Sequence, residues 1–256
     1  MIDWIKHRLA SPHVAAAMRR FAPQLDFIRA RLSRSSDVGL RLTLSALLFI
    51  GATWLFAGVA EDVVTGDPLV EADQVITHWF QRHSAAGVTR WMSLVTDAHD
   101  FIPISALGLA FALYLGWRRE GYWLLALLLV LPGGMLLNLL LKQVFQRGRP
   151  ILDEPLPGLA SYSFPSGHVT GATLLYGVLA VFLATQTPKP GRRVTVYSTA
   201  CLIVLLVAVT RVYLGAHYFS DVVAAAAWGT AWLVLCLVLV GELRRRAVLR
   251  RSAQPH

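Results

Sequence analysis

Charged residues are scarce in this sequence. Only 15% of its 256 residues are Asp, Glu, Lys or Arg, whereas 55% are hydrophobic, and the mean hydropathy is +0.54. Soluble globular domains carry about 25% charged residues, so this composition excludes an ordinary soluble domain and indicates a membrane protein. Acidic residues are the scarcer kind, with 15 against 24 Lys and Arg, which gives a net charge of +9.

Cysteine is also rare, and the two cysteines, Cys201 and Cys236, both lie in apolar segments. Their position excludes a disulfide framework and favours two small hydrophobic side chains. The first 35 residues are basic and contain no continuous apolar core. We therefore expect no cleavable signal peptide.

Long apolar runs dominate the rest of the sequence. A helix needs roughly 20 mostly apolar residues to cross a membrane. We predict an all-α polytopic membrane protein with six transmembrane helices. The six segments are 40–60, 101–117, 121–141, 169–184, 194–210 and 221–240.

The segment 61–100, between the first two predicted spans, has a different pattern. Leu69, Ala72, Ile76 and Trp79–Phe80 recur at helical spacing among polar residues. This spacing predicts one or two amphipathic helices on the outer face of the membrane. We expect them to serve packing and lipid contact, not chemistry.

Most of the basic residues fall in a few short regions. Eighteen of the 24 Lys and Arg residues lie in residues 1–41, 118–119, 189–193 and 244–251. By the positive-inside rule these regions are cytoplasmic, so both termini are expected inside a bacterial cell and the protein in its inner membrane. Topology and attraction to anionic lipids thus explain the net charge, and no nucleic-acid partner is expected.

The predicted organisation has three parts. A basic amphipathic segment (1–36) lies on the cytoplasmic surface, a domain of six spans (37–241) follows, and a basic cytoplasmic tail (242–256) ends the chain. No feature of the sequence sets an oligomeric state.

Four cations stand on the side where this topology disfavours them. Lys142, Arg147, Arg149 and Arg211 lie at or near the outer ends of predicted spans. Snorkelling toward lipid head groups is one explanation. Convergence on a shared anion is the other, and the polar residues beside these cations favour it.

The turn "PSGH", residues 165–168, opens the fourth predicted span on the same face. Gly167 lets backbone N–H groups approach a ligand closely, Ser166 adds a hydroxyl donor, and the start of the helix adds unpaired N–H groups and a positive dipole end. Arg binds two phosphoryl oxygens at once, and Lys supplies a compact charge. The group of residues therefore matches a phosphate ester.

Two histidines give this face a catalytic character. His217 and Asp221 are four residues apart, so a helical turn brings them to one side, where a carboxylate can fix the tautomer of the ring and leave one nitrogen free to attack. His168 can then serve as general acid. Either histidine alone fits an interfacial residue satisfied by water, and residue types do not decide which of the two attacks.

Three stretches, "KQVFQRGRP" (142–150), "PSGH" (165–168) and "RVYLGAHYFSD" (211–221), resemble the signature motifs of the type-2 phosphatidic-acid phosphatase superfamily. That superfamily includes undecaprenyl-diphosphate phosphatases and vanadium haloperoxidases. The resemblance covers residues 40–240. The chain departs from the pattern at Thr210, where the family usually has serine, and the hydroxyl is retained.

The resemblance implies a role for each matching residue. His217 is expected to be the nucleophile that forms a phosphohistidine, Asp221 to orient it, and His168 to protonate the leaving group. The residues expected to hold the phosphoryl oxygens are Lys142, Arg149, Ser166, Gly167 and Arg211. The family needs no metal or other cofactor. Arg147 lies outside the pattern, and we expect it at most to tune the local potential.

The haloperoxidases of this superfamily are soluble proteins that hold vanadate. Six apolar spans favour instead a membrane enzyme whose substrate is a lipid phosphate or diphosphate. Undecaprenyl diphosphate at the outer face is the first expectation, with phosphatidic acid, phosphatidylglycerol phosphate and lipid A phosphates as alternatives. A non-catalytic binder or transporter of lipid phosphates is the alternative of another class. It would need the cations but not the pairing of His217 with Asp221.

A metal site is the competing chemistry, with Asp153, Glu154, His168, His217 and Asp221 as conceivable ligands. Cations outnumber acids here, whereas a phosphatase metal cluster uses several carboxylates. We therefore expect phosphate release to continue in excess EDTA. Complete loss of turnover, restored by Mg²⁺ or Zn²⁺, would contradict direct anion binding.

Overall fold

The computed structural model describes residues 37–151 and 161–252, and all regular structure in these ranges is helical, as predicted. The chain divides into two units, 1–47 and 48–256, and the contacts below belong to the second. The helices are α3 (Asp37–Thr65), α4 (Pro68–Arg82), α5 (Ala86–Asp97), α6 (Phe101–Trp117), α7 (Gly121–Phe145), α8 (Gly167–Thr185), α9 (Pro190–Tyr213) and α10 (Phe219–Ser252). The predicted amphipathic segment at 1–36 lies outside the described residues.

Five of these helices, α3, α7, α8, α9 and α10, are long and apolar enough to cross a membrane. A sixth span results if α5 and α6, which meet at a bend of 44°, are counted together. The predicted six-span, all-α architecture is confirmed to this extent. α10 continues to Ser252, so the part of the predicted tail from 242 to 252 prolongs the last helix.

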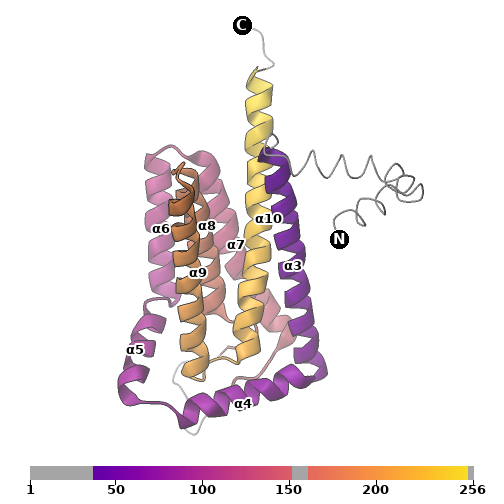
Figure 1. The fold of residues 1–256 in the computed structure, drawn as a ribbon, viewed down its shortest axis with the longest axis vertical. Coiled ribbons are helices and arrows are strands. Elements are labelled where there is room, and N and C mark those ends of the chain that lie inside the picture. Colours follow the sequence, from indigo (N-terminus) through magenta and orange to yellow (C-terminus); the bar gives the residue numbers. More distant parts are fainter. Residues whose placement is uncertain (1–36, 152–160, 253–256) are drawn as a thin grey trace, which may run out of the picture. The chain divides into compact units, whose positions relative to one another are not determined.

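The segment between the first and second spans forms two short helices, which confirms its predicted helical character. α4 begins with Pro68, whose fixed φ suits the first turn of a helix. Asp100 caps α6 by accepting a hydrogen bond from the Phe101 N–H, which ends the α5–α6 connection. α4 crosses the ends of α9 and α10 and contacts both (Figure 1). Its position on the outer face of the membrane stays a prediction.

α8 is the central helix of the bundle, in contact with α6, α7, α9 and α10. Gly134 of α7 allows a close crossing, because a Cβ atom there would lie 2.5 Å from Leu174 Cδ1 and 2.9 Å from Trp232 Cδ1. The glycines of the Pro132-Gly133-Gly134 sequence thus permit a tight approach between helices. Large apolar side chains such as Leu136 remain exposed on the outside, as contact with lipid requires.

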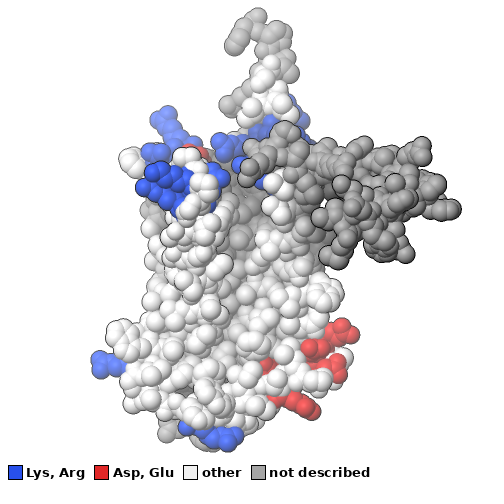
Figure 2. Space-filling view, in the orientation of Figure 1, with Lys and Arg blue, Asp and Glu red and all other residues white. Residues whose placement is uncertain are grey.

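Charge is distributed unequally between the two ends of the bundle. Figure 2 shows Lys and Arg gathered mainly at one end and the acidic side chains mainly at the other. The basic end holds the α6–α7 turn, with Arg118 and Arg119, and the α8–α9 connection, with Lys189. α7 and α9 end at the opposite end, where α8 and α10 begin.

Candidate active site

Four segments far apart in sequence meet at the end of the bundle opposite the basic turns. They are the end of α7 with the chain that follows it, the turn before α8, the end of α9, and the α9–α10 turn with the start of α10. Ser163 N–H donates to Arg147 O, and Ser166 N–H donates to Asp221 O, so backbone bonds join the first, second and fourth segments. His217 N–H donates to Arg211 O and adds the third.

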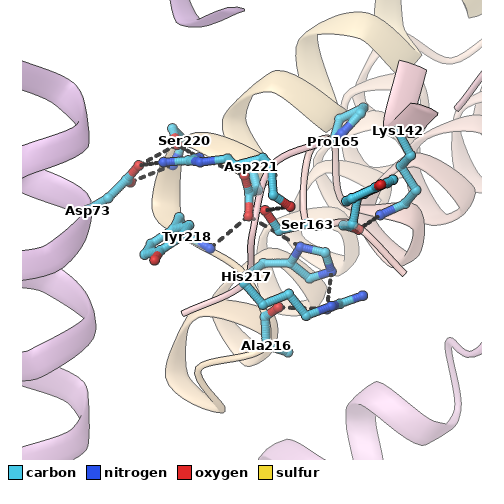
Figure 3. A network of polar contacts seen from close by, with 12 residues as sticks. Asp73, Lys142, Ser163, Pro165, Ala216, His217, Tyr218, Ser220 and Asp221 are labelled. Atoms are coloured by element: carbon cyan, nitrogen blue, oxygen red, sulfur yellow. Dashed lines mark hydrogen bonds and ion pairs between the residues drawn. The ribbon is translucent and has the colours of Figure 1, made fainter. Parts of the chain in front are cut away.

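His217 and Asp221 form the centre of this region (Figure 3). His217 Nδ1 lies 3.4 Å from Asp221 Oδ2, and their side chains are 2% and 0% exposed. The same carboxylate oxygen accepts the Tyr218 N–H at 2.9 Å, three residues back, in the manner of a capping box at the start of α10. Asp221 is therefore fixed by the helix that it caps, and it faces one nitrogen of the imidazole.

The other nitrogen, His217 Nε2, lies 3.5 Å from Arg149 Nη1. Burial lowers the pKa of His217 to about 4, with the charge of Asp221 opposing the shift. The imidazole is thus neutral at pH 7, and a proton on Nδ1, toward Asp221, would leave the Nε2 lone pair beside a guanidinium. This is the arrangement that a nucleophile for an anionic phosphoryl group requires.

The predicted cations Lys142, Arg149 and Arg211 surround the histidine. Lys142 Nζ donates to Tyr162 O, and Arg149 donates to Ala216 O at 2.7 Å and to Ser161 O at 2.8 Å. Backbone carbonyls thus hold two of the cations in place, and no carboxylate in the described part of the chain is paired with either.

Besides His217 Nδ1, which faces Asp221 at 3.4 Å without forming a hydrogen bond, two buried donors of this cluster have no hydrogen-bond partner among the described residues. They are Ser166 Oγ and Arg211 Nε, on side chains that are 0% and 5% exposed. A buried donor without a partner carries a free-energy cost that an anionic ligand would remove. Both are residues predicted to hold phosphoryl oxygens.

The turn before α8 is tied to α7 by a residue that the sequence analysis did not single out. Asn138 Nδ2 donates to Thr170 Oγ1 at 3.0 Å and to Pro165 O at 3.4 Å, on either side of Gly167. The amide is 1% exposed and stands inside an apolar helix, and that position was the available signal.

His168 follows Gly167 in the first turn of α8 and faces a second carboxylate. His168 Nε2 lies 3.5 Å from Asp100 Oδ1. Both residues line one end of a cleft of about 500 Å³, whose walls are otherwise largely apolar and come from α6, α7 and α8. The charges of Arg211 and His217 also act on His168, so all eight predicted site residues lie in one region.

Residues 121–245 match the PAP2 superfamily. The chain is similar to phosphatidylglycerophosphatase B of Bacillus subtilis, with 41% identity over 144 residues, which cover 54% of this chain and 70% of the relative. The chain belongs to the PAP2 superfamily. This PAP2 protein is accordingly a multi-pass membrane phosphatase, a hydrolase of phosphate esters, as the motif resemblance implied.

Two further comparisons agree with this membership. The structure resembles the crystal structure of a transmembrane PAP2-type phosphatidylglycerolphosphate phosphatase from Bacillus subtilis, with a TM-score of 0.66 and 28% identity, covering 77% of this chain and 96% of that one. The PAP2 protein is also similar to a lipid A 1-phosphatase of Rhizobium etli, with 36% identity over 138 residues. That match covers 50% of this chain and 53% of the relative.

The short helices α4 and α5 do more than pack, which corrects the expectation from their amphipathic pattern. Asp73 of α4 is completely buried and pairs with Arg147 at 2.8 Å. Thr96 of α5 accepts from Arg211 Nη1 at 3.0 Å and contacts Thr210 Oγ1 at 3.1 Å. In the sequence, Asp73 could have been recognised as an acidic residue on the helix face that also carries the apolar residues Leu69, Ile76 and Phe80.

Arg147 also has a larger role in the site than its sequence position predicted. Its guanidinium donates to Asp221 Oδ1 at 2.7 Å and to Ser220 Oγ at 2.6 Å, so it does more than tune a potential.

Within the described ranges, no three His, Cys, Asp or Glu side chains are grouped as metal ligands. Asp153 and Glu154, considered as ligands above, lie outside those ranges.

The lowered pKa of His217 predicts a pH effect on stability. As the pH falls from the ordinary value of 6.5 to about 4, the unfolded chain binds a proton that the folded chain does not, so folding loses about 3 kcal/mol at this one site. His217→Gln removes this titration. Between pH 7 and about pH 4.5, the Tm of the wild type in detergent should fall further than that of the variant. Parallel losses in the two proteins would contradict a neutral buried imidazole.

Proposed function

We propose that this protein removes phosphate from a membrane lipid in two steps through a phosphohistidine on His217. The observation that carries the proposal is the position of His217, with Nδ1 facing Asp221 and Nε2 facing Arg149 inside a cluster of cations. A non-catalytic binder would need the cations but no neutral imidazole held between a carboxylate and an arginine.

In the first step, His217 Nε2 attacks phosphorus, an N–P bond forms, and the bond from phosphorus to the lipid oxygen breaks. Arg149, Arg211 and Lys142 neutralise the charge on the phosphoryl oxygens, and Ser166 Oγ donates a further hydrogen bond. Asp221 stabilises the charge that develops on the imidazole. His168 gives its proton to the departing lipid oxygen.

In the second step, water attacks the phosphohistidine. His168, now without its proton, accepts one from the water, an O–P bond forms, and the N–P bond breaks to release inorganic phosphate. His168, which Asp100 faces at 3.5 Å, is thereby protonated again for the next cycle. The same residue therefore serves as acid and then as base.

The cleft beside His168 supports a lipid as the substrate. Asp100 and His168 are at its polar end, and Ile104, Leu131 and Met135 are among the apolar residues along it. A phosphate bound by the cations that lie near His168 would leave the attached chain against these apolar walls. Such burial is favourable for a hydrocarbon and offers little to a small soluble ester.

The phosphomonoester of a glycerophospholipid, phosphatidylglycerol phosphate first, is our preferred substrate. The relative with 41% identity is named for this activity, and the match covers 70% of its length. A lipid A phosphate is supported by a match over half the length of its relative. Undecaprenyl diphosphate, the first expectation from the sequence, stays a prediction.

We place the site on the periplasmic side of the inner membrane. The Lys and Arg of the α6–α7 turn, the α8–α9 connection and the end of α10 support this orientation through the positive-inside rule. His217 lies at the opposite end of the same helices. The carboxylates Glu61, Asp62 and Asp67 lie near this end too, where the α3–α4 connection is.

Phosphate release from a lipid panel tests the function. Purified protein should act faster on phosphatidylglycerol phosphate than on phosphatidic acid, lipid A or undecaprenyl diphosphate. His217→Ala should lower turnover at least about 1,000-fold without loss of folding, because it removes the nucleophile. His78→Ala, an exposed histidine on α4, is the matched control. Equal turnover by the His217 variant, or no release from any lipid by the wild type, would refute the proposal.

His168 can be tested through the leaving group. His168→Ala should slow release from a lipid alkyl phosphate by about 10²- to 10⁴-fold, because an alkoxide needs a proton to depart. The loss should be much smaller in the first step with p-nitrophenyl phosphate, whose phenolate leaves unaided, measured as the burst of p-nitrophenol. An equal loss in both would show that His168 is not the general acid.

A further inference from the structure

The carboxylate of Asp73, on the short helix α4, contacts two residues that adjoin the His217–Asp221 pair, Ser220 and Arg147. Asp73 is 0% exposed, and its Oδ1 accepts the Ser220 N–H at 2.9 Å, one of the unpaired donors at the start of α10. Its Oδ2 accepts from Arg147 Nη2 at 2.8 Å and from the Ser220 hydroxyl. Figure 3 shows Asp73 projecting from α4 toward Ser220.

Arg147 links this carboxylate to the one in the site. Its Nη2 is used by Asp73, while its Nη1 donates to Asp221 Oδ1 at 2.7 Å. The guanidinium also lies 4.4 Å from the centre of the Tyr218 ring. The aromatic ring thus contacts the face of the guanidinium, while the carboxylates bind the N–H groups at its edge. One guanidinium is thus divided between two fully buried carboxylates.

This division determines how Asp221 presents itself to His217. With Oδ1 bound by Arg147, the remaining oxygen, Oδ2, faces the Tyr218 N–H at 2.9 Å and His217 Nδ1 at 3.4 Å. If Asp73 did not hold Nη2, both nitrogens of Arg147 could bind Asp221 in a fork. A bidentate pair would turn Oδ2 toward the guanidinium and away from the imidazole.

We propose that Asp73 and Arg147 are positioning residues for the nucleophile, and that α4 thereby sets the orientation of His217 for attack on the phosphoryl group. Asp73 contacts neither His217 nor the cations that face the phosphoryl group. Its effect passes through Arg147 and Ser220 to Asp221. The inference rests on the proposed function, because it assumes that His217 is the attacking group.

A purely structural role is the alternative, since Asp73 also caps α10 and ties it to α4. Loss of a tie between helices lowers Tm and the folded fraction, but it leaves the ligand affinities of the folded molecules as they are. A misplaced nucleophile instead changes the catalytic rate and the binding of a transition-state analogue. It lowers kcat and weakens binding of orthovanadate, which must bond to His217 to mimic the transition state, while inorganic phosphate needs only the cations.

The test uses Asp73→Asn, which keeps the shape and the bond to the Ser220 N–H but removes the charge that holds Arg147. Per folded molecule, kcat should fall about 10- to 100-fold, as for a nucleophile displaced by up to an ångström. KM and the inhibition constant of phosphate should stay within about threefold, and that of vanadate should rise about tenfold or more. Glu71→Gln, an exposed carboxylate on the same helix, should match the wild type.

Arg147→Lys supplies a second arm, because a lysine keeps the charge but cannot bind two carboxylates through separate nitrogens of one rigid plane. It should reproduce the change in vanadate affinity, and the double variant should be no worse than the worse single one, since both act through one link. If Asp73→Asn does not fold, Ser220→Ala, which keeps the capping bond to Asp73, should show the same pattern to a smaller degree.

Wild-type kcat and wild-type vanadate affinity in Asp73→Asn, with or without a lower Tm, would overturn the inference, as would additive losses in the double variant. The same result in Ser220→Ala would overturn it where Asp73→Asn does not fold. These outcomes differ from a failure of the proposed function. In that case neither the wild type nor Glu71→Gln would release phosphate.

Discussion

Asp221 is the group on which the geometry of the site depends. A carboxylate that is 0% exposed is tolerated only when its oxygens are satisfied by cations or hydrogen-bond donors. Asp221 meets this requirement with Arg147 on one oxygen and the Tyr218 N–H on the other, while its backbone carbonyl accepts the Ser166 N–H. Three segments of the chain are therefore held where one buried charge needs them, and His217 is brought beside that charge.

The cations impose a second constraint. Lys142, Arg149 and Arg211 lie close enough for their charges to act on one another, which opposes folding unless something compensates. Carbonyl groups hold Lys142 and Arg149, and the Thr96 hydroxyl holds Arg211. The charge of Asp221 acts on Lys142 and Arg149, and the charges of Asp100 and Asp97 act on Arg211. The compensation is partial, and under the proposed function a bound phosphoryl group would complete it. Affinity for the anion and the incomplete pairing of the cations thus have the same physical origin.

The sequence was sufficient to predict the parts of the structure that depend on local chemistry. Hydropathy placed the spans, because the interior of a bilayer requires long apolar helices. α6 was predicted with the bounds that the structure has, and α7 and α9 were predicted a few residues too short, since polar ends such as Lys142 and Arg211 continue the helix into the site. The motifs brought together eight residues that do lie in one region.

What the sequence did not reveal depends on pairing at a distance. Asp73 and Arg147 are 74 residues apart, and neither partner alone indicates the other. Asp73 interrupts an apolar helix face and Asn138 stands in an apolar span, so each was detectable as a buried polar residue that needs a partner. Which partner it finds depends on how α4 crosses α10 and how α7 meets the turn before α8. Hydrophobic periodicity says that these helices pack but does not say where they cross.

The division of labour between long and short helices follows from the cost of burying charge. A carboxylate or guanidinium at the centre of a span is expensive, so the spanning helices carry their polar site residues near one end and in the connections beside it. These segments supply His217 and the cations but leave Arg147 and Arg211 in need of further partners. α4 and α5 lie at that end, α5 as the first half of the bent α5–α6 pair, and supply Asp73 and Thr96 for these two arginines. A short amphipathic helix can bury a polar side chain against the bundle while its opposite face stays exposed. These two helices therefore supply partners that the five long helices do not provide.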